Sequence, residues 1–406
     1  MTPQAFSYPT VGNNGLIYVP PYGLNESLDY MLVIDPKTYS IEKIALEVSD
    51  CYEKWQRGIV VGSKIYWLPY NEKNILVLDT KDNSIQYIEV PIDGQGKYIQ
   101  GHVYKNKIYA LPYGEHAPYS YALILDTDAN WVKQIELRIL PDDEKKWHQT
   151  QLIGNTIYGL PRGESLDKHF SYAIEFDCDM ETYTLTDLSN YWTEYDTNKY
   201  CNKKFTTMAK VGNKLWAPPY SEYDDFDLLA KYDNGWTFEH TGIKATSRKY
   251  YSHTVASNNK IYFPPAGHEE DWSEMLIVDA NNNTWYTKDL GIGKESKKYF
   301  AGAENSQGKI YYIPRGGCVC EPEETWKSQG DLAEVLVVDT ADDSCYTIDV
   351  SKYFTDNTTI EKYNQCVIVN DVIYAFPYGE SDSFQTVLIF DTIKEKVIKV
   401  INLNEI

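Results

Sequence analysis

A short phrase that recurs eight times constrains the fold of this chain more than any other feature. The phrase is Ile-Tyr-x-x-Pro, with Leu-Trp in place of Ile-Tyr in the fifth copy, and its prolines follow one another at intervals of 43 to 63 residues. They are Pro21, Pro69, Pro112, Pro161, Pro219, Pro265, Pro314 and Pro377. Because a fixed repeat takes precedence over a division of the chain by length, we expect residues 1–406 to form a single domain of eight repeats.

Each repeat has the pattern of four short strands. In the second repeat the expected strands cover residues 55–61, 64–69, 75–78 and 84–90, and tight turns follow the first and third of them. The third strand is a continuous apolar run that ends at Asp79, whereas the fourth alternates between apolar and polar residues. A repeat of this length with four strands is typical of a propeller blade. The sequence therefore predicts an all-β fold, a single eight-bladed β-propeller with four antiparallel strands in each blade.

The repeats resemble those of the kelch family. The sixth shows the resemblance best, with Lys260-Ile261-Tyr262, then an apolar strand that ends at Asp279, then Asn283-Thr284-Trp285. Where kelch repeats usually carry Gly-Gly after the second strand, this chain carries Pro-Tyr-Gly or Pro-Arg-Gly. The resemblance implies a propeller that serves as a protein-binding scaffold, while a minority of kelch-type propellers are enzymes such as sugar oxidases and sialic acid mutarotases.

Charge and cysteine content narrow the class of partner and the compartment. The net charge of −21 disfavours a nucleic-acid backbone or an anionic membrane surface as the main partner. No apolar run is long enough to cross a membrane, and the first residues lack a signal-peptide pattern. The seven cysteines are odd in number and have no framework spacing, which favours a reducing compartment. We expect a cytoplasmic protein that binds neither nucleic acid nor membrane.

One face of the predicted propeller carries nearly all the variation in loop length. The loops between second and third strands share this face with the connections between blades, and its longest insertions cover residues 187–204, 316–331 and 349–362. Variable loops on a rigid scaffold are where binding residues usually lie. We therefore assign function to this loop face.

The residue after the repeated proline differs between blades. It is tyrosine in five of them, arginine in the fourth and seventh (Arg162 and Arg315), and alanine in the sixth. The tyrosines are Tyr22, Tyr70, Tyr113, Tyr220 and Tyr378. A guanidinium suits a carboxylate or phosphate, so the two arginines are candidates to hold an anionic ligand or an acidic side chain of a partner. The alternative is that each pairs with a local carboxylate such as Glu164 or Glu321.

Two insertions add aromatic candidates. Residues 322–327 suit a short helix that presents Trp326, either as an anchor for a partner or as packing for its own loop. Trp192 lies in an aromatic and acidic cluster that fits either a sugar platform or loop packing. Cys318 and Cys320 have no nearby second pair of ligands, and we predict no metal site there.

Features present in nearly every blade are interpreted as structural. A lysine followed by an aromatic opens seven of the first strands, and a glutamate follows six of the prolines, which we interpret as packing between blades with partly exposed ion pairs. The alternative is a ring of aromatics and charges around a binding mouth. His102, His148 and His253 fall in first strands at unequal positions, which disfavours a shared metal. The aspartates after the third strands are interpreted as turn formers.

These features together predict a non-enzymatic scaffold that binds a macromolecular partner, most simply a protein, through its loop face. Its candidate binding residues are Arg162, Arg315, Trp326, Trp192, Tyr113, Tyr220 and Tyr378. We assign no catalytic residue, cofactor or metal, since no phosphate loop, nucleophile elbow or metalloprotease motif occurs. One alternative is a propeller that binds or isomerises an anionic sugar, and a further alternative is a viral structural or receptor-binding component.

Overall fold

The structure is a computed structural model. It describes residues 6–23, 28–115, 119–138, 145–162, 170–193, 204–220, 226–243, 250, 254–266, 273–292, 298–316, 332–354, 362–377 and 384–406. Eight four-stranded antiparallel sheets account for its strands, which makes the fold an eight-bladed β-propeller, as predicted. Contacts divide the chain into two compact units, Thr2–Thr206 with blades one to four and Thr207–Ile406 with blades five to eight.

The first unit contains sixteen strands. Blade one has β1 (Thr10–Val11), β2 (Ile17–Val19), β3 (Tyr30–Asp35) and β4 (Ser40–Ala45). Blade two has β5 (Trp55–Val61), β6 (Lys64–Pro69), β7 (Asn74–Asp79) and β8 (Ser84–Glu89). Blade three has β9 (His102–Tyr104), β10 (Lys107–Ala110), β11 (Tyr121–Asp126) and β12 (Trp131–Glu136). Blade four has β13 (Thr150–Ile153), β14 (Thr156–Gly159), β15 (Tyr172–Asp177) and β16 (Thr182–Asp187), followed by a 3₁₀ turn, η1 (Ser189–Tyr191).

The second unit repeats this plan. Blade five has β17 (Ala209–Val211), β18 (Lys214–Ala217), β19 (Leu228–Tyr232) and β20 (Trp236–His240). Blade six has β21 (Val255–Ser257), β22 (Lys260–Phe263), β23 (Glu274–Asp279) and β24 (Thr284–Asp289). Blade seven has β25 (Tyr299–Glu304), β26 (Lys309–Pro314), β27 (Glu334–Asp339) and β28 (Cys345–Asp349), then η2 (Ser351–Tyr353). Blade eight has β29 (Tyr363–Val369), β30 (Val372–Pro377), β31 (Thr386–Asp391) and β32 (Lys396–Asn402), then η3 (Leu403–Glu405).

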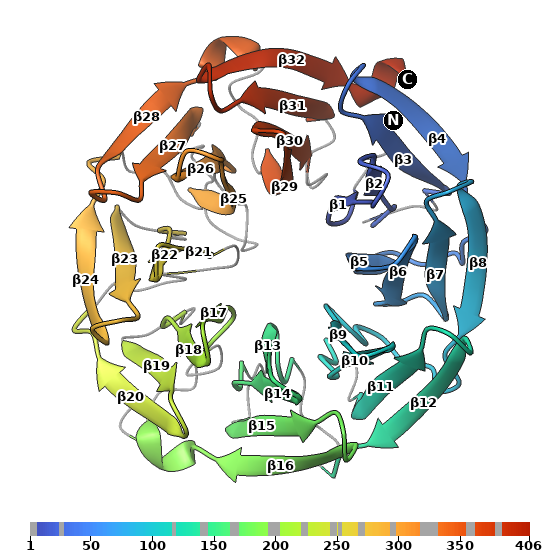
Figure 1. Cartoon of the computed structure of the whole chain (residues 1–406), viewed down its shortest axis with the longest axis vertical. Helices are drawn as coiled ribbons and strands as arrows, with labels where there is room; N and C mark the ends of the chain where they lie inside the picture. Colours follow the sequence, from blue (N-terminus) through green and yellow to red (C-terminus); the bar gives the residue numbers. More distant parts are fainter. Residues whose placement is uncertain are drawn as a thin grey trace, which may run out of the picture. The chain divides into compact units, whose positions relative to one another are not determined.

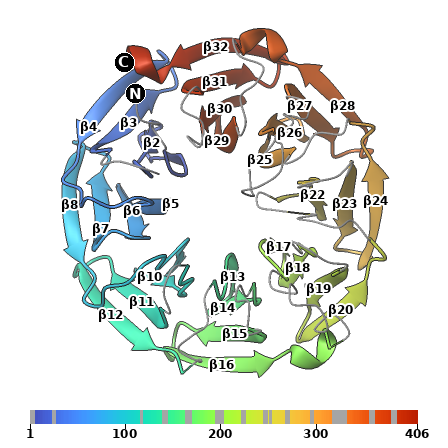
Figure 2. The ribbon, with the colours of Figure 1, turned by 180° about the vertical axis from the view of Figure 1, so that it is seen from behind.

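Each blade is a meander whose first strand is innermost and whose fourth is outermost (Figures 1 and 2). The strand limits expected for the second repeat are confirmed, with β5 and β6 as predicted, β7 one residue longer at each end and β8 one residue shorter. Both faces of β7 are covered and four successive residues are buried, whereas β8 alternates between more and less exposed positions. Among the described residues, no helix is long and apolar enough to span a membrane.

The core of each unit is divided among the spaces between neighbouring blades. One apolar cluster joins Tyr18 and Met31 of blade one to Trp55 and Trp67 of blade two. Similar clusters lie between blades two and three, three and four, five and six, six and seven, and seven and eight. No blade buries its two faces alone, so stability comes from blade-to-blade packing.

The turn between the third and fourth strands has similar geometry in the eight blades. The aspartate that ends the third strand accepts backbone N–H bonds from residues two or three positions later, for example Asp126 Oδ1 from Asp128 N at 3.0 Å. A residue in this turn has a positive φ in each blade, at Tyr39, Asn83, Asn130, Glu181, Asn234, Asn283, Asp343 and Glu395. Asparagine and aspartate accept this left-handed conformation most readily among residues with side chains. The repeated aspartate is therefore a turn former.

A Lys-Ile-Tyr phrase on the second strands of blades three, six and seven links each of these strands to the 3–4 turn of the next blade. Lys107 Nζ lies 2.8 Å from the carboxylate of Glu181, and Tyr109 Oη donates to the carbonyl of Cys178 at 2.9 Å. Lys309 Nζ makes the same contact with Glu395 at 3.1 Å. Glutamate is an unusual residue at positive φ, and these ion pairs between blades explain its use at the two turns.

Candidate functional site

The residue after each repeated proline is fixed by backbone hydrogen bonds on both sides. In the first unit, Lys97 N donates to Tyr70 O at 2.9 Å and Lys97 O accepts from Tyr113 N at 2.8 Å. The same exchange runs on through Lys146 to Arg162, and from Arg162 O to Lys204 N. We call this series the backbone belt. It sets the post-proline side chains of successive blades beside one another at the start of their 2–3 loops.

The lysines of the belt are buried, not partly exposed as expected. The described members Lys54, Lys97, Lys146, Lys204, Lys298 and Lys362 are at most 1% exposed. The Lys97 ammonium donates to Gly94 O at 2.8 Å, and Lys146 Nζ donates to Tyr119 O at 3.3 Å. Burial lowers the pKa of Lys54 and Lys97, an effect that nearby acidic groups only partly offset. Lys97 Nζ also lies 3.6 Å from the exposed carboxylate of Asp93, so at this position a loop carbonyl adds to the expected ion pair.

Of the six glutamates that follow the prolines, Glu72 and Glu115 lie in the described part of the chain. Glu72 is buried and accepts hydrogen bonds from Ser49 N at 2.8 Å and Ser49 Oγ at 2.7 Å. Glu115 pairs with Lys145 at 3.0 Å. Both therefore hold neighbouring segments together, which agrees with the structural interpretation of this position.

Arg162 lies in a cluster of aromatic and cationic side chains on the belt. Its guanidinium carbon is 5.6 Å from the centroid of the Tyr113 ring, and the His148 ring meets the same tyrosine edge to face at 5.4 Å. His148 Nδ1 is 2.7 Å from Thr206 O, and Tyr70 packs against Tyr113 at 6.3 Å between centroids. We call Tyr70, Tyr113, His148 and Arg162 the Arg162 cluster. All but Tyr70 come from two adjacent blades, three and four.

Arg315 has the corresponding place in the second unit. Its N–H donates to Lys298 O at 2.9 Å, its carbonyl accepts from Lys362 N at 2.7 Å, and its guanidinium lies 3.8 Å from the centroid of the Phe300 ring. Arg162 is 6% exposed and Arg315 is 4% exposed. Both arginines are thus held against aromatic rings by a fixed backbone, which suits planar recognition of an oxyanion group.

The other predicted site residues fall into two groups. Trp192 is fully buried, and its indole N–H donates to Ser171 Oγ at 3.1 Å, so it packs its insertion onto blade four. Tyr220 is buried on the belt position of blade five. Trp326 and Tyr378 lie outside the described residues, as do Cys318, Cys320 and His253.

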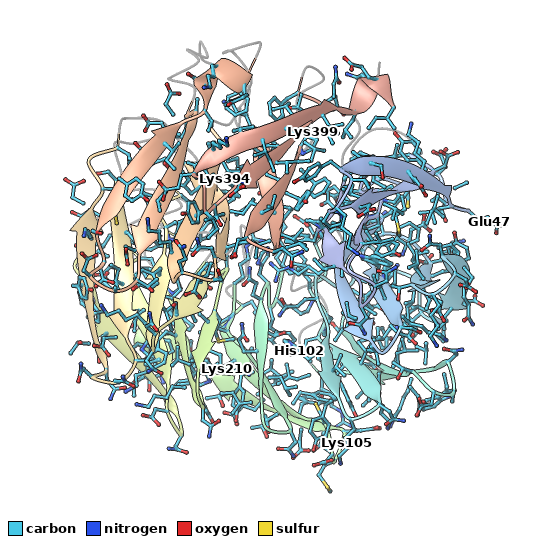
Figure 3. The ribbon with its side chains drawn as sticks, turned by 45° about the horizontal axis from the view of Figure 1, so that its top comes forward. Glu47, His102, Lys105, Lys210, Lys394 and Lys399 are labelled. Carbon is cyan, nitrogen blue, oxygen red and sulfur yellow. The ribbon has the colours of Figure 1, made fainter. Side chains whose placement is uncertain are left out.

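A polar network on the inner strands was not predicted as a site. Arg57 Nη1 on β5 donates to Gln100 Oε1 at 2.9 Å, and Gln100 Nε2 donates to Thr150 O at 2.7 Å. His102 Nε2 lies 2.7 Å from Thr150 Oγ1. We call Arg57, Gln100, His102 and Thr150 the inner-strand network, and Figure 3 labels His102 on β9 within it. The available signal was that Arg57 is the one arginine at its position among the eight repeats.

The two described histidines of the first strands do not converge on a metal. His102 contacts Thr150, while His148 contacts Tyr113 and Thr206. Within the described part of the chain, no group of three or more potential metal ligands is present.

Comparison with known proteins supports the fold but does not indicate a function. No protein-family model matches the sequence, and neither does any curated protein. Among solved structures, apo AztD from Citrobacter koseri matches with a TM-score of 0.56 at 10% identity, over 99% of this chain and 95% of that one. A second structure of Citrobacter koseri AztD matches with a TM-score of 0.54 at 10% identity, over 92% of each chain. Hydrazine synthase of Kuenenia stuttgartiensis gives 0.47 at 9% identity, over 99% and 96%. At such identity, likeness to AztD shows a shared propeller fold alone.

Proposed function

We propose that this chain is a non-enzymatic binding propeller that engages a partner protein through its loop face, where Arg162 and Arg315 hold carboxylates of the partner. The observation that carries the proposal is the Arg162 cluster. The belt fixes the backbone of Arg162 on both sides, and the Tyr113 ring supports its guanidinium. A cation that is already positioned loses little conformational entropy when it binds a carboxylate.

The charge of the chain limits what such a partner can be. A net charge of −21 repels a strongly acidic protein at long range. The partner that fits is one with isolated carboxylates on a neutral or basic surface, because the overall charges then attract while each carboxylate meets an arginine. Binding of this kind should weaken as the salt concentration rises.

A random peptide library displayed on phage tests this proposal without knowledge of the natural partner. We expect the wild-type protein to enrich peptides with one or two acidic residues, and an Arg162→Gln/Arg315→Gln variant to bind those peptides at least about tenfold more weakly. Arg138→Gln removes an exposed arginine of blade three and serves as the matched control. Peptides that bind the double variant as tightly as wild type contradict the assignment.

An anionic sugar is a second candidate for the same cluster. Tyr70 and Tyr113 place two buried rings, tilted by 32° to each other, beside Arg162, and aromatic rings next to a guanidinium suit a sugar that carries a carboxylate. A thermal-shift screen with sialic and uronic acids tests it, since a ligand at 100 times its Kd adds about 2.7 kcal/mol of stability. A rise in melting temperature that disappears in the double variant favours the sugar. No change in melting temperature with any sugar, while peptide binding is intact, favours the protein partner.

We also propose that the repeats are of the kelch type and that the protein is cytoplasmic. Kelch-type repeats are supported by the phrases of the sixth repeat, and a cytoplasmic location by cysteine usage.

A further inference from the structure

Arg57, on β5 of the first unit, forms no ion pair with any carboxylate in the part of the chain that the structure describes. Its guanidinium carbon lies 4.6 Å from the centroid of the Tyr8 ring, and its Nη1 donates to Gln100 Oε1 at 2.9 Å. Neither neighbour carries a negative charge. Among the described residues, no carboxylate forms an ion pair with Arg57, and its Nε is covered without any acceptor. Arg57 is therefore half-buried, and no described carboxylate compensates its charge.

This arrangement is unexpected from the composition of the chain. Asp and Glu number 59 against 38 Lys and Arg, so carboxylates are in surplus. A half-buried charge is usually paired, since its desolvation is otherwise unfavourable. The sequence supplies a carboxylate to Lys107, Lys133 and Lys260 but places an amide beside Arg57.

The groups around Arg57 are held in fixed orientations. Gln100 Nε2 donates to Thr150 O at 2.7 Å and to Thr150 Oγ1 at 2.9 Å, which turns the amide oxygen toward Arg57. Thr150 is buried and also contacts His102 Nε2 at 2.7 Å. The Tyr8 ring covers one face of the guanidinium. Residues from blades one to four thus converge here, and donors held in this way favour a ligand that needs no rearrangement.

We propose that Arg57 anchors an oxyanion site on the inner edge of blades two to four, and that its ligand is a carboxylate or phosphate group of a small molecule. Such a group supplies the missing negative charge and accepts from the guanidinium N–H groups that Gln100 leaves available. Gln100 and Thr150 set the position of the arginine and do not compete for the ligand, because their own hydrogen bonds are already made. The site lies on the first strands, apart from the post-proline residues of the proposed loop-face function.

Isothermal titration calorimetry with inorganic phosphate, sulfate and glutarate tests the proposal, with sodium chloride at equal ionic strength as the blank. We expect saturable binding of at least one oxyanion, and a loss of at least about tenfold in affinity in Arg57→Gln. Arg138→Gln is the matched control and should bind like wild type. Binding of phosphate alone identifies a phosphate site, and binding of glutarate alone identifies a carboxylate site. No saturable binding at millimolar concentration, or equal affinity in Arg57→Gln, overturns the proposal.

Two further measurements keep the test decisive if Arg57→Gln folds poorly. Arg57→Lys keeps the charge but removes the planar fork, and we expect it to bind more weakly than wild type. Crystals soaked in selenate should show an anomalous peak at hydrogen-bond distance from the Arg57 guanidinium, and an empty site there contradicts the assignment. The Arg162→Gln/Arg315→Gln variant should retain the anion affinity, so failure of the loop-face proposal is distinguishable from failure of this one.

Discussion

Substitution of Asp343 by asparagine should destabilise the protein by weakening the contacts of one carboxylate between blades six and seven. The Asp343 carboxylate accepts hydrogen bonds from Lys260 Nζ, from Tyr262 Oη at 2.6 Å and from Tyr286 Oη. Burial alone would raise the pKa of this carboxyl, but the hydrogen bonds from Lys260 and the two tyrosines outweigh burial and lower it. The native state therefore favours the ionised carboxylate.

The expected loss follows from what asparagine keeps and what it removes. Asparagine matches the shape of aspartate and accepts the φ of 59° at this position, so the backbone adds no cost. Its oxygen can still accept from a tyrosine, but the Lys260 ammonium loses its counter-charge. The Lys260 and Asp343 side chains are 25% and 11% exposed, so solvent screens the pair only in part. We expect Asp343→Asn to lower the free energy of unfolding by about 2–3 kcal/mol.

Urea unfolding at pH 7, followed by tryptophan fluorescence, measures this difference. Asp342→Asn is the matched control, because Asp342 is exposed in the same turn and accepts from Ser344 N at 2.9 Å, a bond that asparagine preserves. It should change the free energy of unfolding by less than about 0.5 kcal/mol. A loss of less than about 0.5 kcal/mol for Asp343→Asn as well would refute the role given to this carboxylate.

The pH dependence gives an independent check with a defined sign. Because the native pKa of Asp343 lies below its unfolded value of about 3.9, its contribution is complete above that pH and declines as pH falls through the native pKa. The difference between wild type and Asp343→Asn should therefore be constant near neutrality and shrink below about pH 4. A difference that stays unchanged down to pH 2 would contradict the electrostatic explanation.

Two further predictions concern the buried lysines and the first insertion. The free energy of unfolding of Lys97→Met at pH 7 should lie within about 1 kcal/mol of the wild-type value, because methionine can occupy the space of the buried lysine stem and the substitution removes a buried charge. Because burial lowers the pKa of Lys97, the native ammonium loses its proton at a lower pH than the unfolded one, and wild type should gain stability relative to Lys97→Met between pH 7 and pH 10. Urea midpoints at both pH values measure this difference. A loss of stability relative to Lys97→Met would contradict the prediction. Trp192→Ala should cost about 3–5 kcal/mol in the same assay, because a fully buried indole and its bond to Ser171 are lost. Tyr191→Ala, at a side chain that is 48% exposed, is its control, and equal effects of the two would contradict the packing role of Trp192.

Arg162 and Arg315 are visible in the sequence as exceptions to the repeat, whereas Arg57 was not predicted as a site residue. Comparison of the eight post-proline residues singled out Arg162 and Arg315, and both share the belt geometry in the structure. Arg57 is an exception of the same kind in the first strands, because the other repeats have tyrosine, glutamine, threonine, serine or alanine at its position. The sequence could not show that Gln100 Oε1 faces Arg57, because that orientation depends on Thr150 of the next blade.

The sequence by itself determined the number of blades, their four strands and the turn chemistry, because these depend on hydrophobic alternation and on turn residues a few positions apart. It predicted the limits of β5 and β6 from Trp55 to Pro69 for this reason. Only the tertiary structure decided which polar groups are buried and what they contact. Lys97 is buried under a loop, and Asp343 meets Lys260 across more than eighty residues of chain. Contacts between blades depend on how two sheets pack face to face, and that packing is not encoded in the spacing of any single repeat.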